Sequence, residues 1–265
     1  MQDLKILCLQ SDIVSNDPDK NRELFEIKIR NHAENHDLII LPETFTTSFH
    51  VEPEGNSETL EGKTVAWMQQ MAVKSGAVIT GSLFIEKEGK YYNSLIWMRP
   101  DGSFESYEKR HVFSMGGENE KISKGTKKRV VEIKGWKIAP MICYDLRFPV
   151  WSKNTLHIEG SYAYDLAIYV ANWPAVRNYP WEMLLISRAI ENLAYVAGIN
   201  RVGYDAQGTF YSGDSMIIDP KGKVIEKADE GKERSLSAIL SHSELVSFRQ
   251  KFNVGLDWDQ FDIKI

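Results

Sequence analysis

The sequence predicts one α/β domain over residues 1–265, with mixed strands stacked into two sheets and helices on the outside. Short apolar runs typical of strands alternate with segments whose apolar residues recur at helical spacing. Apolar residues make up 43% of the chain, which is enough for a large core. No repeat, low-complexity tract or long linker divides the chain, so we expect a single domain.

In the first half of the chain, strands alternate with helices. "KILCLQ" predicts a strand with Cys8 as apolar filler, and Asp17-Pro18 can open a helix. "HDLIILPE" predicts a second strand, and the next helix should run from Leu60 to Lys74 and stop at Gly76. "AVITGSLFIEKEGKYYNSLIWMRPDGSFESYEKRH" predicts three strands joined by the turns "KEGK" and "RPDG".

The second half continues this pattern. "KGWKIAPMIC" predicts a strand with a helix opening near Phe148-Pro149, and "YDLAIYVANW" predicts a strand buried on both faces. The strongest helical pattern runs from Tyr179 to Ala197, with Gly198 as its end. Its expected apolar stripe consists of Ile186, Ile190, Leu193 and Ala197. "FYSGDSMIIDPKGKVIEKA" predicts a final hairpin around "DPKG".

Composition excludes several classes of protein. A net charge of −5 argues against nonspecific nucleic-acid binding, and no apolar run is long enough to span a bilayer. The start, "MQDLKILCLQ", lacks the basic and long apolar segments of a signal peptide. Two cysteines form no disulfide framework. We therefore expect a cytoplasmic protein without nucleic-acid or membrane partners.

Four reactive side chains lie at strand ends or in a nearby loop. Glu43 ends the strand in "LIILPETFT", Lys109 the strand in "ESYEKRHVF" and Cys143 the strand in "MICYDLRFP". Glu118 lies in the glycine-flanked loop "MGGENEKISKG". Open α/β sheets bind ligands outside their strand ends. Taken singly, each residue has an ordinary alternative as a solvated charge or as core packing.

These residue types suit nucleophilic catalysis. A free thiol near neutral pH is only a few per cent thiolate, so a catalytic cysteine needs a base or a cation. Glu43 could supply the base, and Lys109 could stabilise negative charge on a substrate oxygen. The backbone N–H of Tyr144, at a strand-to-helix turn, could be a second oxyanion donor.

"LPETF", "YEKRHVF" and "ICYDLRFP", in this order and at these intervals, resemble the three signatures of the nitrilase superfamily of carbon–nitrogen hydrolases. The resemblance covers nearly the whole chain. It implies an α-β-β-α sandwich and a Glu-Lys-Cys triad at Glu43, Lys109 and Cys143. It also implies a second glutamate between the lysine and the cysteine, for which Glu118 is the first candidate and Glu120 the second.

The residues after the nucleophile resemble the amidase branches. True nitrilases usually show Cys-Trp-Glu, whereas this chain has Cys-Tyr-Asp-Leu-Arg-Phe. "YVANWPAVRNYPWEMLLISRAIENLAYVAGINRVG" most resembles the bacterial omega-amidases, which hydrolyse the terminal amide of 2-oxoglutaramate and 2-oxosuccinamate. An amidase of deaminated glutathione, or another small aliphatic amidase, is the nearest alternative.

Such substrates are small anions, so the pocket should hold a cation. A guanidinium binds a carboxylate through two hydrogen bonds, which makes Arg147, Arg177 and Arg201 candidates. Each arginine could instead tie loops or subunits together. Trp173 and Phe49 could form apolar walls.

The histidines suggest further hypotheses. His111, two residues beyond the lysine, should face the pocket from the same side of its strand. A Cys-His protease would use His50 or His111, but no third orienting group is evident. His32 and His36 in "HAENH" have zinc-binding spacing, but the metalloprotease form needs a glutamate after the first histidine. Partly buried helix histidines are the better interpretation, and no metal site is predicted.

The implied mechanism is acyl transfer in two steps. Glu43 takes the thiol proton and Cys143 attacks the amide carbon, while Lys109 and the Tyr144 N–H hold the oxyanion. Glu43 then protonates departing ammonia, and a water activated by Glu43 hydrolyses the thioester. Glu118 orients Lys109 or the substrate amide. No cofactor is needed.

Two other classes stay open: a non-catalytic binding protein on the same fold, and an acyltransferase that uses the same thioester. The resemblance also implies a homodimer. Family members pair through the helix after the nucleophile and the long helix, here Tyr179 to Ala197.

Overall fold

The computed structural model describes residues 1–32, 35–49 and 52–265, and their strands form two six-stranded sheets and a small ribbon. The first sheet contains, in spatial order, β14 (Arg234–Leu240), β1 (Leu4–Gln10), β2 (Leu38–Ile40), β3 (Val78–Lys87), β4 (Lys90–Met98) and β5 (Phe104–Glu108). The second contains β13 (Val224–Lys227), β12 (Met216–Ile218), β9 (Tyr195–Asn200), β8 (Leu166–Ala171), β7 (Trp136–Ile142) and β6 (Val131–Ile133). The ribbon pairs β10 (Val202–Tyr204) with β11 (Phe210–Ser212).

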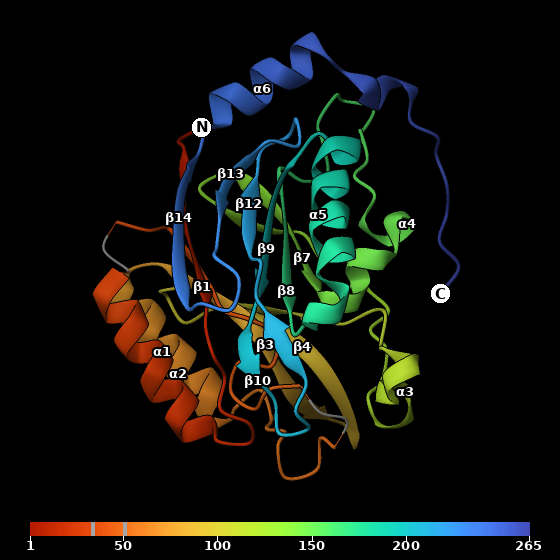
Figure 1. Ribbon diagram of the computed structural model, residues 1–265. Coiled ribbons are helices and arrows are strands. Elements are labelled where there is room, and N and C mark those ends of the chain that lie inside the picture. Colours follow the sequence, from red (N-terminus) through yellow and green to blue (C-terminus); the bar gives the residue numbers. More distant parts are fainter. Residues whose placement is uncertain (33–34, 50–51) are drawn as a thin grey trace.

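Helices cover the outer sides of the stacked sheets (Figure 1). The α-helices of the described residues are α1 (Pro18–His32), α2 (Lys63–Ser75), α3 (Glu118–Lys121), α4 (Pro149–Ser152), α5 (Asn178–Asn192) and α6 (His242–Lys251). Short 3-10 turns are η1 (Ser114–Gly116), η2 (Cys143–Arg147), η3 (Ala175–Arg177) and η4 (Val254–Asp257). Helices α1 and α2 pack on the first sheet and α5 packs on the second, which confirms the α-β-β-α sandwich.

Chain connections explain the strand directions. β1, β2 and β3 are parallel neighbours because α1 and α2 serve as the crossovers between them. β3, β4 and β5 form the predicted antiparallel series. Glu88 and Gly89 both have positive φ (53° and 71°), as a tight hairpin turn requires, and this fixes the pairing of Lys87 with Lys90.

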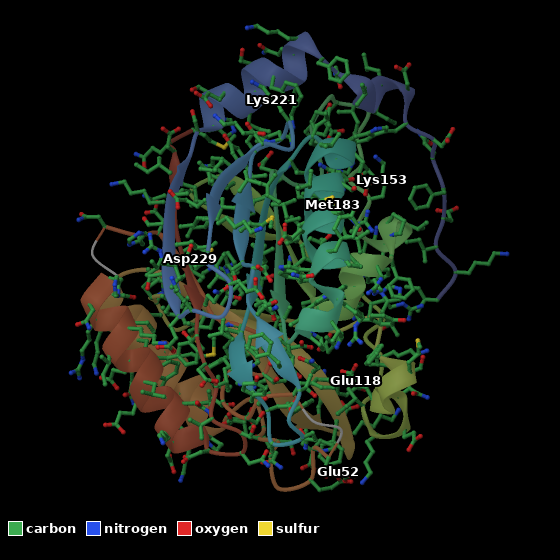
Figure 2. All side chains as sticks on the ribbon, in the orientation of Figure 1. Glu52, Glu118, Lys153, Met183, Lys221 and Asp229 are labelled. Atoms are coloured by element: carbon green, nitrogen blue, oxygen red, sulfur yellow. The ribbon has the colours of Figure 1, made fainter. Side chains whose placement is uncertain are left out.

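Side chains fill the space between the two sheets (Figure 2). Successive residues of β1 serve two cores because strand side chains alternate in direction. Ile6 and Cys8 pack between the sheets, whereas Leu7 and Leu9 pack under α1 and α2. Cys8 is therefore the predicted apolar filler, and its burial raises the pKa of its thiol.

The long helix α5 is shorter than the sequence predicted. It ends at Asn192, and Leu193 takes a left-handed φ of 48° that stops the helix. The following residues form β9, which pairs with β8 and β12. Gly198 lies inside β9 and does not end the helix: a Cβ there would lie 2.4 Å from Leu185 Cδ1 of α5.

The predicted stripe of α5 was also wrong. Its buried apolar side chains are Trp181, Leu185 and Ala189, whereas Ile190 is half exposed. In the described part of the chain, no helix has both the length and the apolar character that crossing a membrane requires.

Candidate active site

Glu43, Lys109 and Glu118 form one buried hydrogen-bonded cluster. The Lys109 Nζ donates to Glu43 Oε1 at 2.9 Å and to both carboxylate oxygens of Glu118, at 3.1 and 3.0 Å. Each of the three residues is at most 1% exposed. Glu43 follows β2 and Lys109 follows β5, so both come from the first sheet. Glu120 is exposed, and Glu118 is therefore the second glutamate in contact with Lys109.

Burial and neighbouring charges shift the pKa values of Lys109 and Glu118. Burial alone would lower the pKa of Lys109, but the carboxylates of Glu118 and Glu43 outweigh that effect and raise it. Burial raises the pKa of Glu118, and the nearby Lys109 ammonium opposes this shift. Lys109 therefore stays protonated between the carboxylates and offers a fixed positive charge.

Cys143 lies beside this cluster. It is the first residue after β7, a strand of the second sheet. The residue is partly exposed and lines the pocket, and its Sγ donates to the backbone O of Asn172 at 3.9 Å. Burial and then the Glu43 carboxylate raise the pKa of the thiol, and Lys109 only partly offsets them. The resting thiol is consequently protonated at neutral pH, and attack requires a base.

Cys143 has a positive φ of 42°, which is costly for a residue with a side chain. The buried carboxylate of Asp145 holds this turn. Its oxygens accept from Ile142 N at 3.1 Å, from the Tyr107 hydroxyl at 2.7 Å and from His111 N at 2.9 Å. Tyr107 belongs to β5, so Asp145 ties the turn that carries Cys143 to the strand that precedes Lys109.

Two asparagines that the sequence analysis did not single out orient Glu43. The Asn93 Nδ2 donates to Glu43 Oε1 at 2.8 Å, and the Asn172 N–H donates to Glu43 Oε2 at 2.7 Å. Asn172 directly follows β8, as Cys143 follows β7 and Glu43 follows β2. The sequence signal for Asn172 was its position as a polar residue at the end of the apolar run "YDLAIYVAN".

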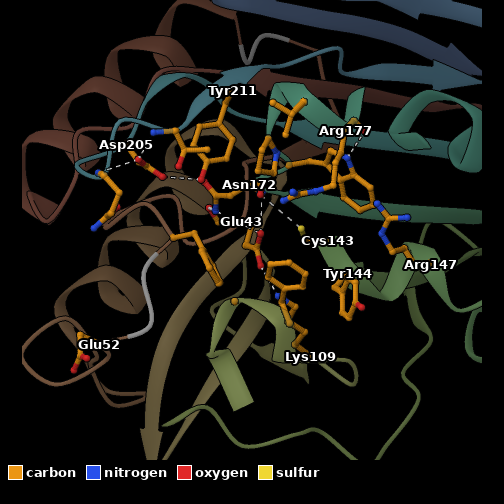
Figure 3. Close-up of a pocket in the computed structure, with 18 residues that line it drawn as sticks. Glu43, Glu52, Lys109, Cys143, Tyr144, Arg147, Asn172, Arg177, Asp205 and Tyr211 are labelled. Atoms are coloured by element: carbon orange, nitrogen blue, oxygen red, sulfur yellow. Dashed lines mark hydrogen bonds and ion pairs between the residues drawn. The ribbon is translucent and has the colours of Figure 1, made fainter. Parts of the chain in front are cut away.

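A cavity of about 460 Å³ opens over Cys143 (Figure 3). Its lining includes the predicted residues Glu43, Phe49, Lys109, Cys143, Tyr144, Arg147, Trp173 and Arg177. The Arg147 guanidinium lies 4.7 Å from the centre of the Trp173 ring, and that of Arg177 lies 5.7 Å from the centre of the Phe113 ring. Within the described residues neither arginine has a carboxylate partner, so both are available to an anion.

Two residues predicted for the pocket lie elsewhere. The His111 Nδ1 pairs with Asp145 at 2.8 Å, and its ring stacks 3.7 Å from that of Phe148. Arg201 is fully buried, where it pairs with Asp12 at 2.9 Å and also bonds Ser48. Both side chains connect segments of the protein: the buried Arg201 guanidinium finds the polar partners that it needs, and the partly exposed His111 imidazole pairs with Asp145.

The other histidines give no site. His32 is exposed at the end of α1, so the expectation of a partly buried side chain was wrong there. His36 lies beyond α1, and His50 falls outside the described residues. Among the residues described, no group of His, Cys, Asp and Glu side chains could hold a metal ion.

Comparison with known proteins agrees with this geometry. The model of the carbon-nitrogen hydrolase family matches residues 5–250. The chain is 41% identical over 261 residues to omega-amidase YafV of Yersinia enterocolitica, covering 98% of this chain and 99% of the relative. It is 33% identical over 235 residues to 2-oxoglutaramate amidase of Bacillus subtilis, covering 87% and 88%.

A solved structure is also similar. XC1258 from Xanthomonas campestris is described as a CN-hydrolase superfamily protein with an arsenic adduct in the active site. It superimposes with a TM-score of 0.97 at 41% identity and full coverage of both chains.

Proposed function

The chain belongs to the carbon–nitrogen hydrolase family, and from this premise we propose that it is a cysteine-dependent omega-amidase. It hydrolyses the terminal amide of 2-oxo dicarboxylic acid monoamides, such as 2-oxoglutaramate and 2-oxosuccinamate, to the 2-oxo acid and ammonia. The observation that carries this proposal is the Glu43–Lys109–Glu118 cluster beside a partly exposed Cys143. Relatives named as omega-amidase and 2-oxoglutaramate amidase support the substrate class.

The substrate's carboxylate lies on the arginine side of the pocket. Arg147 and Arg177 provide positive charge without internal carboxylate partners, and Trp173 and Phe49 provide apolar walls for the short carbon chain. In Figure 3 Arg147 lies on the opposite side of Cys143 from Glu43, and Arg177 lies above Cys143. The substrate amide then reaches Cys143 with its nitrogen toward Glu43.

Acylation begins with proton transfer. Because the resting thiol is protonated, Glu43 takes the Sγ proton as the sulfur attacks the amide carbon. The Lys109 ammonium and the Tyr144 N–H stabilise the oxyanion. Glu43 returns the proton to the amide nitrogen, the C–N bond breaks and ammonia leaves a thioester on Cys143.

In deacylation Glu43 again acts first as a base and then as an acid. Glu43 removes a proton from a water molecule, and the resulting hydroxide attacks the thioester carbon. The C–S bond breaks and the proton on Glu43 returns to Sγ, which releases the 2-oxo acid. Glu118 holds the Lys109 ammonium in place throughout, through both of its carboxylate oxygens.

The chain acts as one catalytic domain and as a homodimer in the cytoplasm. The match of the family model to residues 5–250 supports one domain. Exposed apolar side chains along α4, η3 and α5 support pairing through this face: Val150, Val176, Tyr179, Met183 and Ile190. A reducing compartment suits a thiol nucleophile.

Ammonia release tests the proposed activity. Wild-type protein should release ammonia from 2-oxoglutaramate faster than it hydrolyses deaminated glutathione, and Cys143→Ala should release none above background. Preference for the deaminated tripeptide would assign the alternative amidase, and ammonia release by Cys143→Ala would refute the mechanism.

A further inference from the structure

Asn172 contacts both the proposed base and the proposed nucleophile. Its backbone N–H donates to Glu43 Oε2 at 2.7 Å, and its backbone O accepts from the Cys143 Sγ at 3.9 Å. Because both contacts come from one residue's backbone, its position sets the distance between the carboxylate and the thiol. Asn172 is 5% exposed and lies at the base of the pocket (Figure 3).

The side chain of Asn172 crosses from one sheet to the other. Its Nδ2 donates to the backbone O of Glu43 and to Thr44 Oγ1, both at 2.9 Å, and lies 3.5 Å from Glu43 Oε2. Glu43 follows a strand of the first sheet and Asn172 a strand of the second. Thr44 has a positive φ of 39°, so the turn that carries the base needs such support.

The side-chain amide of Asn172 is oriented so that its Nδ2 donates to Glu43 and Thr44, and this orientation leaves its oxygen unpaired within the described part of the chain. Its Oδ1 is buried without a hydrogen-bond partner among the described residues. Leaving a buried acceptor unsatisfied costs free energy. The reversed amide would instead place Oδ1 against the backbone O and the carboxylate of Glu43, which are both acceptors.

Two other asparagines hold the segments that carry Asn172 and Glu43. Asn200 accepts from Trp173 N at 2.8 Å and donates to Trp173 O at 2.9 Å, which holds the residue after Asn172. Asn93 donates to Glu43 Oε1, and its backbone O accepts from Lys109 N at 2.8 Å. Each carboxylate oxygen of Glu43 thus has its own asparagine donor.

We propose that Asn172 is a positioning residue that orients Glu43 Oε2 toward Cys143 and so makes proton transfer from the thiol possible. This role rests on the proposed function, since it assumes that Glu43 is the base. The Asn172 side chain reaches the main chain and carboxylate of Glu43, and its backbone contacts both that carboxylate and Cys143. Asn172 thereby acts on the chemical step and leaves the binding of the substrate's carboxylate to the arginines.

Substitution of Asn172 should separate kcat from KM. Asn172→Ala removes the Nδ2 donor, and displacement of a catalytic group by about 1 Å can cost about 10²-fold in rate. With 2-oxoglutaramate we expect kcat to fall about 10²-fold while KM changes less than about threefold. A rise in KM alone would make Asn172 a substrate-binding residue, and unchanged kcat in folded protein would also refute the proposal.

A charged variant tests the contact with Glu43 directly. Asn172→Asp places a second carboxylate beside that of Glu43, so one of the two acids will hold a proton at higher pH than usual. The ratio of variant to wild-type kcat should therefore rise as pH falls, because protonation of the introduced carboxyl restores a donor. A ratio that is constant with pH would contradict the proposal.

Asn154→Asp is the matched control. Asn154 is buried, and its Nδ2 also donates to two backbone carbonyls, those of Tyr164 and Asn192, outside the residues that line the pocket. This variant should lose stability, measured as Tm, but keep a pH-independent kcat ratio. The same pH dependence in Asn154→Asp would show a general effect of buried charge and overturn the assignment.

Alkylation of Cys143 distinguishes failure of this inference from failure of the proposed activity, because it needs no substrate. The extra carboxylate in Asn172→Asp should raise the thiol pKa and slow iodoacetamide labelling several-fold at pH 8, measured by mass spectrometry. Asn154→Asp should label at the wild-type rate. Equal labelling of all three proteins would overturn the proposal even if the wild type hydrolyses no 2-oxo acid amide.

Discussion

At the scale of single residues, the Cys143 thiol differs from one that is ionised by a neighbouring cation. Lys109 is the cation near it, but Glu43 and Glu118 both bond that ammonium. Burial and then the Glu43 carboxylate raise the thiol pKa more than Lys109 lowers it, so the resting thiol keeps its proton. In the proposed mechanism, proton transfer to Glu43 is therefore part of the reaction and not a property of the resting site.

This protonation state predicts the pH dependence of alkylation. Because the folded-state pKa of Cys143 lies above its usual value, the iodoacetamide labelling rate should keep rising with pH through about pH 9. Labelling would be followed by mass spectrometry of the peptide that contains Cys143. A plateau reached near neutral pH would show a preformed thiolate and contradict this description.

The pocket arginines predict the substrate's charge. A hydrogen bond to a charged group contributes about 1.5–3 kcal/mol, so Arg177→Met or Arg147→Met should lower kcat/KM for 2-oxoglutaramate about 10- to 100-fold. Both variants should still hydrolyse a neutral aliphatic amide at nearly the wild-type rate. The exposed Arg129 lies outside this pocket, so Arg129→Met should change neither rate. Equal losses on both amides would assign these arginines to structure.

The sequence could indicate the reactive members of the site but not the residues that orient them. Glu43, Lys109 and Cys143 follow strands and have side chains that can react. Asn93 and Asn172 do not ionise and suggest no chemistry by themselves. Their role depends on how two sheets stack, which strand patterns along one chain do not specify. The same limit placed His111 and Arg201 wrongly in the pocket.

At the scale of elements, the turn η2 decides whether Cys143 reaches the pocket. Asp145 is the buried acceptor for this turn, for β5 and for the segment that follows Lys109. It holds the left-handed backbone of Cys143, which would otherwise relax toward an extended strand.

Asp145→Ala should lose both stability and turnover. Several buried donors lose their acceptor, at about 1–3 kcal/mol for an unsatisfied group, so the free energy of unfolding should fall by about 3 kcal/mol. Urea denaturation would measure the loss, with kcat falling in the protein that remains folded. Asp101→Ala, which removes an exposed turn carboxylate, should cost under about 1 kcal/mol. Equal losses in the two variants would show that Asp145 does not support the turn.

Element prediction succeeded where local signals were clear and failed where a segment suits two structures. Turn residues marked the hairpins of β3, β4 and β5, and Gly76 capped α2 as expected. The apolar segment after Asn192 could continue a helix or form a buried strand, and pairing between β8 and β12 selects the strand. β14 was not anticipated, although Leu236, Ala238 and Leu240 alternate along it with exposed residues.

At the scale of the whole molecule, the site exists only where the two sheets meet. The first sheet supplies Glu43 and Lys109, and the second supplies Cys143 and Asn172. Relative movement of the sheets would therefore separate Glu43 from Cys143.

If two chains pair through α4 and α5, charges added to these helices should dissociate the dimer and lower the mass of the particle in solution. Met183 lies on α5 (Figure 2), and both it and Val150 are exposed. The double variant Val150→Glu, Met183→Glu should halve the mass measured by light scattering, because two like charges per chain would face each other across the interface. Phe104→Glu, at an exposed position on β5, should leave the mass unchanged. Wild-type protein that is already monomeric would contradict the dimer.

The most direct test of the central claim is mass spectrometry of protein quenched in acid within its first turnovers of 2-oxoglutaramate. The account predicts an added 2-oxo acyl group on the peptide that contains Cys143, removed by hydroxylamine and absent in Cys143→Ala. Steady ammonia release with no adduct at Cys143, or with an adduct on another residue, would contradict a thioester mechanism at this site.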